Sequence, residues 1–140
     1  MSSKYKLSKL QIDVTQNCGT EKPFDNEYWN NDADGIYVDI ISGEPLFCSI
    51  HKYDSGTGWP SFFDVINNDN ISKHKDFKLG YERIELKSKK TNSHLGHLFN
   101  DGPNNKQRYC INSASLKFIS LNDLSKNGYG HLVNLFKNKE

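Results

Sequence analysis

Hydrophobic residues near the start of the chain are spaced as on one face of a helix, and those further along are spaced as in strands. Ser8 and Gln11 have the spacing of a capping box, the apolar positions up to Val14 fall near one helical face, and Gly19 can close the segment. A second short helix is expected to start near Pro23, because the fixed φ of proline suits a first helical turn. The pattern therefore predicts short helices at the N-terminus.

After residue 35 the runs are rich in β-branched and aromatic residues, and clusters of glycine, asparagine or proline separate most of them. We predict strands at 36–41, 45–50, 79–87, 94–99 and 107–119. No long helical period intervenes, so the strands are expected to be antiparallel. Segment 121–136 suggests a helical turn, a break at Asn127-Gly128 and an apolar tail. The predicted fold is mainly β: a single domain over 1–140 with antiparallel sheets and short N-terminal helices.

Composition narrows the classes of function. The chain has 140 residues, 35% of them hydrophobic and 25% charged, with a net charge of +1, which argues against disorder and gives nucleic-acid binding little electrostatic support. No apolar run approaches the roughly 18 residues of a membrane span, and no secretory signal follows Met1. A cytoplasmic location is therefore expected, without membrane or nucleic-acid partners.

The three cysteines, Cys18, Cys48 and Cys110, are widely spaced and odd in number. No CxxC pair exists, so a zinc site of four cysteines is excluded, and a framework of several disulfides is implausible. One reversible disulfide plus one spectator thiol remains open. In a reducing compartment such a disulfide would be transient and catalytic.

The segment 108–114 places a cysteine in a strand-like run. Side chains alternate faces along a strand, so Arg108, Cys110 and Asn112 are expected to point the same way. A neighbouring guanidinium favours the thiolate, which is the nucleophilic form of cysteine. In the plainer interpretation, Cys110 is only a small buried hydrophobic residue.

Two further motifs carry candidate chemistry. His94 and His97 face opposite ways in a regular strand, so a metal site with both would need Gly96 to bend the backbone. A histidine near the cysteine is more useful as a proton donor or as a cation that favours the thiolate. Trp59, which Pro60 follows in a glycine-containing loop, can wall a pocket or can simply fill the core.

Taken together and in order, these motifs resemble the B-type methionine sulfoxide reductases, which reduce the R epimer of methionine sulfoxide. The resemblance covers nearly the whole chain. It rests above all on the blocks GWPSF at 58–62, SHLGH at 93–97 and RYCINSA at 108–114, with GTEKPF at 19–24 before them. The blocks are specific in combination.

The resemblance implies a role for each site residue. Cys110 matches the nucleophile that attacks the sulfoxide sulfur, releases methionine and becomes a sulfenic acid. His94, His97 and Asn112 match positions that orient the substrate and protonate its oxygen. The substrate-binding positions are Trp59, which receives the methyl group, together with Phe99 and Arg108.

Two departures from the family pattern bear on cofactors and on recycling. Many members bind structural zinc through two CxxC pairs, which this chain lacks, so no zinc or other cofactor is expected. Many also carry a resolving cysteine where this chain has Thr57. Cys18 is then the candidate resolving cysteine, Cys48 looks like a buried spectator, and direct reduction of the sulfenic acid by an external thiol is the third possibility.

The expected partners are oxidised proteins that carry R-methionine sulfoxide, and thioredoxin or dithiothreitol as the external reductant. A monomer is expected. Two other functions stay open: a cysteine hydrolase that uses Cys110, a histidine and Asn112, and a β-rich binding module without activity that uses Trp59.

Overall fold

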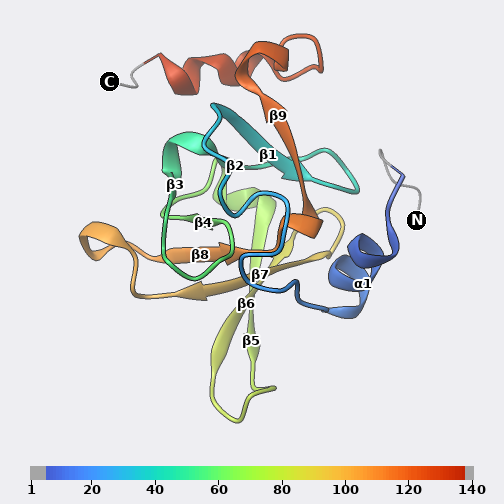
Figure 1. Cartoon of the computed structure of the whole chain (residues 1–140), viewed down its shortest axis with the longest axis vertical. Helices are drawn as coiled ribbons and strands as arrows, with labels where there is room; N and C mark the ends of the chain where they lie inside the picture. Colours follow the sequence, from blue (N-terminus) through green and yellow to red (C-terminus); the bar gives the residue numbers. More distant parts are fainter. Residues whose placement is uncertain (1–5, 138–140) are drawn as a thin grey trace.

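The fold is built around two antiparallel β-sheets within residues 6–137, the part of the chain that the computed structural model describes (Figure 1). The smaller sheet has the order β2-β1-β9 and the larger has the order β3-β4-β8-β7-β6-β5. The strands of the smaller sheet are β1 (Gly35–Asp39), β2 (Pro45–Cys48) and β9 (Leu116–Ser120). Those of the larger sheet are β3 (Lys52–Tyr53), β4 (Ser61–Phe62), β5 (Ile71–Asp76), β6 (Arg83–Ser88), β7 (His94–Phe99) and β8 (Arg108–Ile111). The predicted class, mainly β with antiparallel strands, is confirmed.

The first helix, α1 (Lys9–Asn17), forms as predicted. The Gln11 N–H donates to Ser8 Oγ at 3.2 Å and the Ser8 N–H donates to Gln11 Oε1 at 2.8 Å, which is the expected capping box. The helix ends differently from the prediction. Cys18, rather than Gly19, takes the left-handed conformation at the C-cap, with φ of 57°.

The second helix expected near Pro23 is wrong. Segment 21–34 is irregular, and Phe24 has a left-handed φ of 61°, which a helix cannot include. Its backbone groups bond elsewhere instead: the Phe24 N–H donates to the Gly58 carbonyl at 2.8 Å and the Tyr28 N–H donates to Ser113 Oγ at 2.9 Å. These long-range bonds override the local signal.

The strand predictions need several corrections. The strand predicted at 45–50 ends at Cys48, because a 3₁₀ turn begins at Ser49. Strands β3, β4 and β5 were not predicted; β3 and β4 have two residues each, and β5 has a single apolar residue, Ile71, and three exposed central side chains. The strand predicted at 79–87 begins only at Arg83, since 77–82 forms the turn between β5 and β6. The run 107–119 is two strands, separated by a short 3₁₀ turn at Ser113–Ser115. Further 3₁₀ turns lie at Ser49–His51, Asn68–Asn70, Pro103–Asn105, Leu121–Asp123 and Gly130–Phe136.

The two sheets enclose an apolar core. Its buried side chains come from strands of both sheets, and aromatic and aliphatic residues are equally represented: Tyr37, Phe47, Phe62, Leu86, Leu95, Leu98, Tyr109 and Ile111. A second cluster covers the other face of the smaller sheet, where Ile36, Val38 and Cys48 pack with the C-terminal segment that lies above β1 and β9 in Figure 1. The outer face of the larger sheet is thereby left for polar side chains.

Within residues 6–137, no helix is both long and apolar enough to span a bilayer. Residues 1–5, on which the expectation about a secretory signal partly rests, lie outside the described part of the chain, as do 138–140 at the end of the predicted domain.

Candidate active site

A cavity of about 250 Å³ lies on the larger sheet, over β6, β7 and β8. Its walls come from the segment after α1, from the loop before β4 and from the turn between β5 and β6. Most of the site residues predicted from the sequence line it: Cys18, Trp59, His94, His97, Phe99, Cys110 and Asn112. Arg108 does not line it.

The pairing of residues on neighbouring strands of the larger sheet places the reactive side chains next to one another. Ser61 on β4 is opposite Cys110 on β8, which is opposite His97 on β7, which is opposite Glu85 on β6. Directly opposed residues of antiparallel strands point to the same face with neighbouring side chains. The cysteine and one histidine are therefore adjacent on the outer face.

A β-bulge brings the second histidine to the same cavity. The β6 residues 86–87 pair with Gly96 and His94, so Leu95 is the extra residue on β7. An extra residue shifts the alternation of side chains by one position. As a result, the rings of His94 and His97 have centroids 5.5 Å apart. The expectation that the two histidines face opposite ways is corrected by this bulge.

Asn112 follows the end of β8 and is held in place by two neighbours. Its backbone N–H and its side-chain amide both donate to the Leu95 carbonyl, at 2.9 and 3.2 Å. Its Oδ1 accepts from the Glu21 N–H at 3.1 Å, and the Glu21 carbonyl accepts from the Trp59 indole at 3.0 Å. Glu21 therefore links the buried amide to the aromatic wall of the cavity.

The Cys110 thiol is half-buried, and burial raises its pKa. Arg108 acts in the opposite direction through its charge and a hydrogen bond, and a hydrogen bond from the Thr57 hydroxyl also lowers the pKa. Burial is the larger effect. The sequence-based expectation of a favoured thiolate is thus only half right, because the guanidinium acts as expected but does not outweigh desolvation.

Arg108 contacts two residues beside the cavity, Phe99 and Asp101. Its guanidinium carbon lies 4.3 Å from the centre of the Phe99 ring, and its Nε donates to Asp101 Oδ1 at 2.8 Å. This hydrogen bond lowers the pKa of Asp101. The Asp101–Arg108 pair therefore supports the Phe99 ring, which forms one side of the cavity; the expected role of Arg108 in substrate binding stays a prediction.

His97 is bound to a carboxylate that the sequence did not point to. Its Nε2 lies 2.8 Å from Asp76 Oδ2, which also accepts from Arg83 Nη2 at 3.1 Å. A bond from the Lys78 N–H, followed by that from His97, lowers the pKa of Asp76 to about 2. Asp76 is therefore an anion at neutral pH, and it fixes one of the two ring nitrogens of His97.

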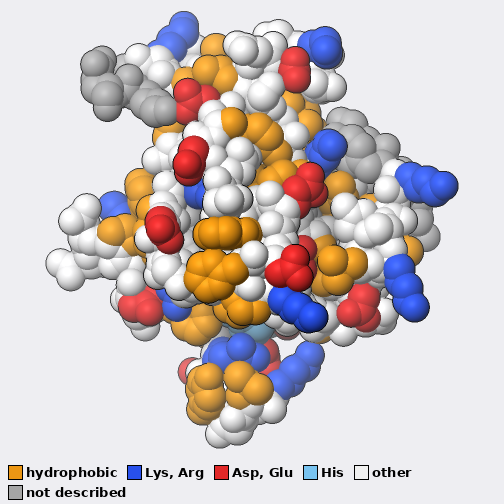
Figure 2. All heavy atoms as spheres, in the orientation of Figure 1, with side chains coloured by type: hydrophobic (Ala, Val, Ile, Leu, Met, Phe, Trp, Pro, Cys, Tyr) orange, Lys and Arg blue, Asp and Glu red, His pale blue; other side chains and the backbone are white. Residues whose placement is uncertain are grey.

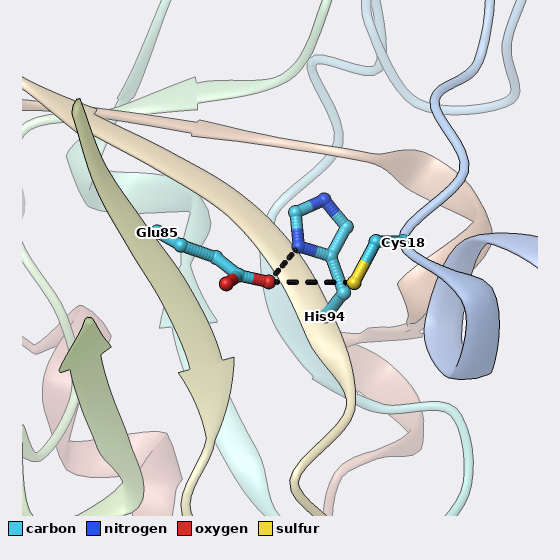
Figure 3. A group of neighbouring side chains, drawn as sticks. All are labelled: Cys18, Glu85 and His94. Atoms are coloured by element: carbon cyan, nitrogen blue, oxygen red, sulfur yellow. Dashed lines mark hydrogen bonds and ion pairs between the residues drawn. The ribbon is translucent and has the colours of Figure 1, made fainter. Parts of the chain in front are cut away.

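His94 shares a different carboxylate with Cys18 (Figure 3). His94 Nδ1 lies 2.7 Å from Glu85 Oε2, and the Cys18 thiol donates to the same oxygen at 3.7 Å. Burial lowers the pKa of His94, partly opposed by Glu85, and burial together with Glu85 raises the pKa of Cys18. Among the described residues, these three side chains also form the group that could hold a metal ion.

Cys48 is fully buried in the second core cluster, on the other face of the smaller sheet, and does not line the cavity.

Asp76, Arg83 and Glu85 were not predicted as site residues. Asp76 ends β5, one of the strands that were not predicted, so nothing in the sequence placed it beside His97. Arg83 and Glu85 are two residues apart in a predicted strand, and this spacing would have put both charges on one face. The sequence alone does not show which face of the sheet carries these two charges, or which residues of the neighbouring strands lie beside them.

Comparison with known proteins adds two findings. Residues 7–120 match the model of the SelR domain. A protein of Vibrio cholerae serotype O1, named peptide methionine sulfoxide reductase MsrA/MsrB, is 55% identical over 133 residues, which is 94% of this chain. The chain spans about a third of that relative's length, 35%.

Proposed function

Because the chain belongs to the SelR domain family, we propose that it reduces R-methionine sulfoxide to methionine with Cys110 as the nucleophile. The observation that carries the proposal is the register across the sheet, in which Cys110 and His97 are directly opposed in a cavity walled by Trp59 and Phe99. A sulfur nucleophile, a proton donor and an aromatic surface are what this reaction requires.

In the first step the Cys110 sulfur attacks the sulfoxide sulfur. The sulfoxide oxygen is transferred to cysteine, so the thiol becomes a sulfenic acid and methionine leaves with its sulfur reduced. Burial keeps the free thiol protonated, while Arg108 and Thr57 stabilise the thiolate once it forms. When the sulfur attacks, its proton passes by way of His97 to the sulfoxide oxygen, so that thiol and sulfoxide together give the sulfenic acid and methionine.

The sulfoxide oxygen is a poor leaving group until it is protonated, and we assign this step to His97. Asp76 binds one ring nitrogen and orients the imidazole. His94 is buried, and burial lowers its pKa so that less of it is protonated; we therefore assign it, with Asn112, to orienting the substrate. Trp59 receives the substrate methyl group, and Phe99 bounds the cavity beside it.

Protein-bound sulfoxide is the proposed main substrate. Three large apolar side chains, Phe77, Leu79 and Tyr81, are exposed by 58–59% in the turn between β5 and β6, which projects from the molecule in Figure 1. Figure 2 shows orange side chains gathered at this tip, at the bottom of the view. Since Leu79 also lines the cavity, the patch is continuous with the site and can hold the apolar flanks of an oxidised polypeptide.

Recycling is proposed to run through a Cys18–Cys110 disulfide that thioredoxin, or dithiothreitol in the test tube, reduces. Both cysteines line the same cavity, whereas Cys48 is enclosed in the core. The electrons come from external thiols, so no resident metal or other cofactor is needed. The proposed setting is the cytoplasm, with the protein acting as a monomer and as one domain.

The disulfide has its own test. Stoichiometric R-sulfoxide without reductant is expected to give a Cys18–Cys110 peptide by mass spectrometry. Cys18→Ser is expected to lose thioredoxin-driven turnover and to keep one round of methionine release. Normal recycling of this variant by thioredoxin would assign the resolving step to Cys48 or to direct reduction.

The activity itself is tested with separated epimers of methionine sulfoxide in a peptide and dithiothreitol as reductant. We expect turnover of the R epimer only. Turnover of the S epimer alone, or of neither, would contradict the proposal.

A further inference from the structure

Three different metal-binding side chains converge at one wall of the cavity. We propose that Cys18, Glu85 and His94 bind a zinc-class divalent cation, and that the bound cation inhibits the reductase. The binding half of this inference is independent of the proposed function, and the inhibition half rests on it.

The ligand atoms are close to the positions that zinc requires. The Cys18 sulfur, a Glu85 oxygen and a His94 ring nitrogen all lie within 4.8 Å of one another. The individual separations are 2.7 Å from His94 Nδ1 to Glu85 Oε2 and 3.7 Å from that oxygen to the sulfur. Tetrahedral zinc, with bonds of about 2.0–2.3 Å, holds its ligands roughly 3.3–3.6 Å apart. Small side-chain movements are enough to reach this geometry.

The three residues come from separate elements that fix them in place. Glu85 lies within β6 between two paired strands, and His94 begins β7 at the bulge and is buried. Cys18 caps α1 in a left-handed conformation, with its N–H bonded to the Asp13 carbonyl. The cap turns the thiol toward Glu85, as Figure 3 shows.

The donor set suits zinc better than magnesium or calcium. Thiolate and imidazole are preferred by zinc and later transition metals, whereas the harder cations select oxygen ligands. Three protein ligands leave a fourth position, and here that position can open to the cavity that Cys110 also lines. Sites with this arrangement bind water or another small ligand at the fourth position.

Occupation of the site would stop the proposed reaction in two ways. The metal would hold the Cys18 thiol as a ligand, so this thiol could not resolve the sulfenic acid at Cys110. It would also hold His94, which the proposed mechanism uses to orient the sulfoxide. The metal would therefore act as an inhibitor, and its three ligands lie outside the apolar core between the sheets.

Cobalt is the probe for binding. Reduced protein, desalted without oxygen, is titrated with Co²⁺, and we expect the near-ultraviolet charge-transfer band of a cobalt–thiolate bond with the visible bands of tetrahedral cobalt. Cys18→Ser is expected to remove the charge-transfer band, and Cys110→Ser, the matched control in the same cavity, is expected to keep it. Glu85→Gln is expected to weaken binding by more than about 10-fold, since even outer-shell partners contribute 10–100-fold.

No thiolate band in the parent, a band that survives Cys18→Ser, or one that disappears in Cys110→Ser would each overturn the assignment. Circular dichroism of every variant separates loss of a ligand from loss of the fold.

Zinc is the probe for inhibition. Methionine release in a single turnover, without added thiols, is measured with and without Zn²⁺ for the parent and for Cys18→Ser, each compared with its own zinc-free rate. We expect zinc to slow the parent at least about tenfold and to leave the variant unaffected. Equal inhibition of both proteins would mean that zinc acts at Cys110, and no inhibition of the parent would refute the regulatory role. If the parent releases no methionine at all, the proposed function fails while the cobalt result stands.

Discussion

The two faces of the larger sheet differ completely although the same strands supply both. The inner face carries Phe62, Leu86 and Tyr109, which are buried in the apolar core between the sheets. The outer face carries Ser61, Cys110, His97 and Glu85 in lateral register. Tyr109 and Cys110 are adjacent in the sequence, yet Tyr109 is part of the core and Cys110 is part of the reactive face.

This difference shows how a small β-domain can hold reacting groups precisely. Each reactive side chain stands between neighbours whose side chains are packed on the opposite face, so its backbone cannot move without disturbing the core. The face exposed to the cavity can then carry groups that contribute little to stability. Substitutions on the outer face should change activity, and those on the inner face should change the free energy of unfolding.

The largest effect is expected from Cys110→Ser. Serine has nearly the same shape but is far less nucleophilic, so turnover of R-sulfoxide should fall by more than about 100-fold, or 2.7 kcal/mol of barrier. The melting temperature should stay within a few degrees of the parent. Cys48→Ala is the matched control, and its steady-state turnover should stay near the parent value. Retention of more than about a hundredth of the activity in Cys110→Ser would make the nucleophile assignment wrong.

On the inner face, Phe62→Ala should lower the free energy of unfolding by about 3–5 kcal/mol, the usual range for truncation of a fully buried phenylalanine. Its ring stacks on Phe47 with centroids 4.6 Å apart, so the cavity left behind cannot easily be filled. Urea denaturation measures this value. A loss below about 1 kcal/mol would show that the inner face is not the rigid support described here.

Within the outer face, the two histidines should differ. His97→Ala should slow sulfenic acid formation by roughly 100-fold, the scale for losing a general acid. His94→Ala should slow it less, because this buried histidine has a lowered pKa and bonds to Glu85. Single-turnover rates across pH distinguish the two variants. Small and equal effects would rule out the acid role of His97.

The smallest effect is expected at the exposed turn. Tyr81→Ser should raise KM for an oxidised peptide with apolar flanks by about fivefold, because roughly 1 kcal/mol of apolar contact is lost. Turnover of free methionine sulfoxide should not change, since Tyr81 does not line the cavity. The control is Leu10→Ser on α1, a leucine with comparable exposure of 50%. Equal effects on both substrates would remove the turn from substrate recognition.

Local features of the fold were readable from the sequence. The capping box of α1 and the left-handed Gly128 at the predicted break follow from residue type and spacing. Strands β7 and β8 fall within predicted runs, because alternating apolar residues are buried on one side. Strand β5 gave no such signal, because its central side chains are exposed.

What the sequence could not provide is the pairing between strands. The contact between His97 and Asp76, and that between His94 and Glu85, depend on register and on a bulge of one residue at Leu95. A shift of one residue would turn every side chain to the other face. Long-range bonds likewise converted the expected helix near Pro23 into an irregular segment that carries Glu21 to Asn112.

The central claim, that the outer face is reactive through Cys110, is tested most directly by trapping the oxidised cysteine. Cys18→Ser protein is given one equivalent of R-sulfoxide with a dimedone-type reagent and no thiol. We predict one methionine released per chain and one adduct, located on Cys110 by peptide mass spectrometry, with neither product from the S epimer. Release of methionine without an adduct on Cys110, or an adduct on Cys48, would contradict the account.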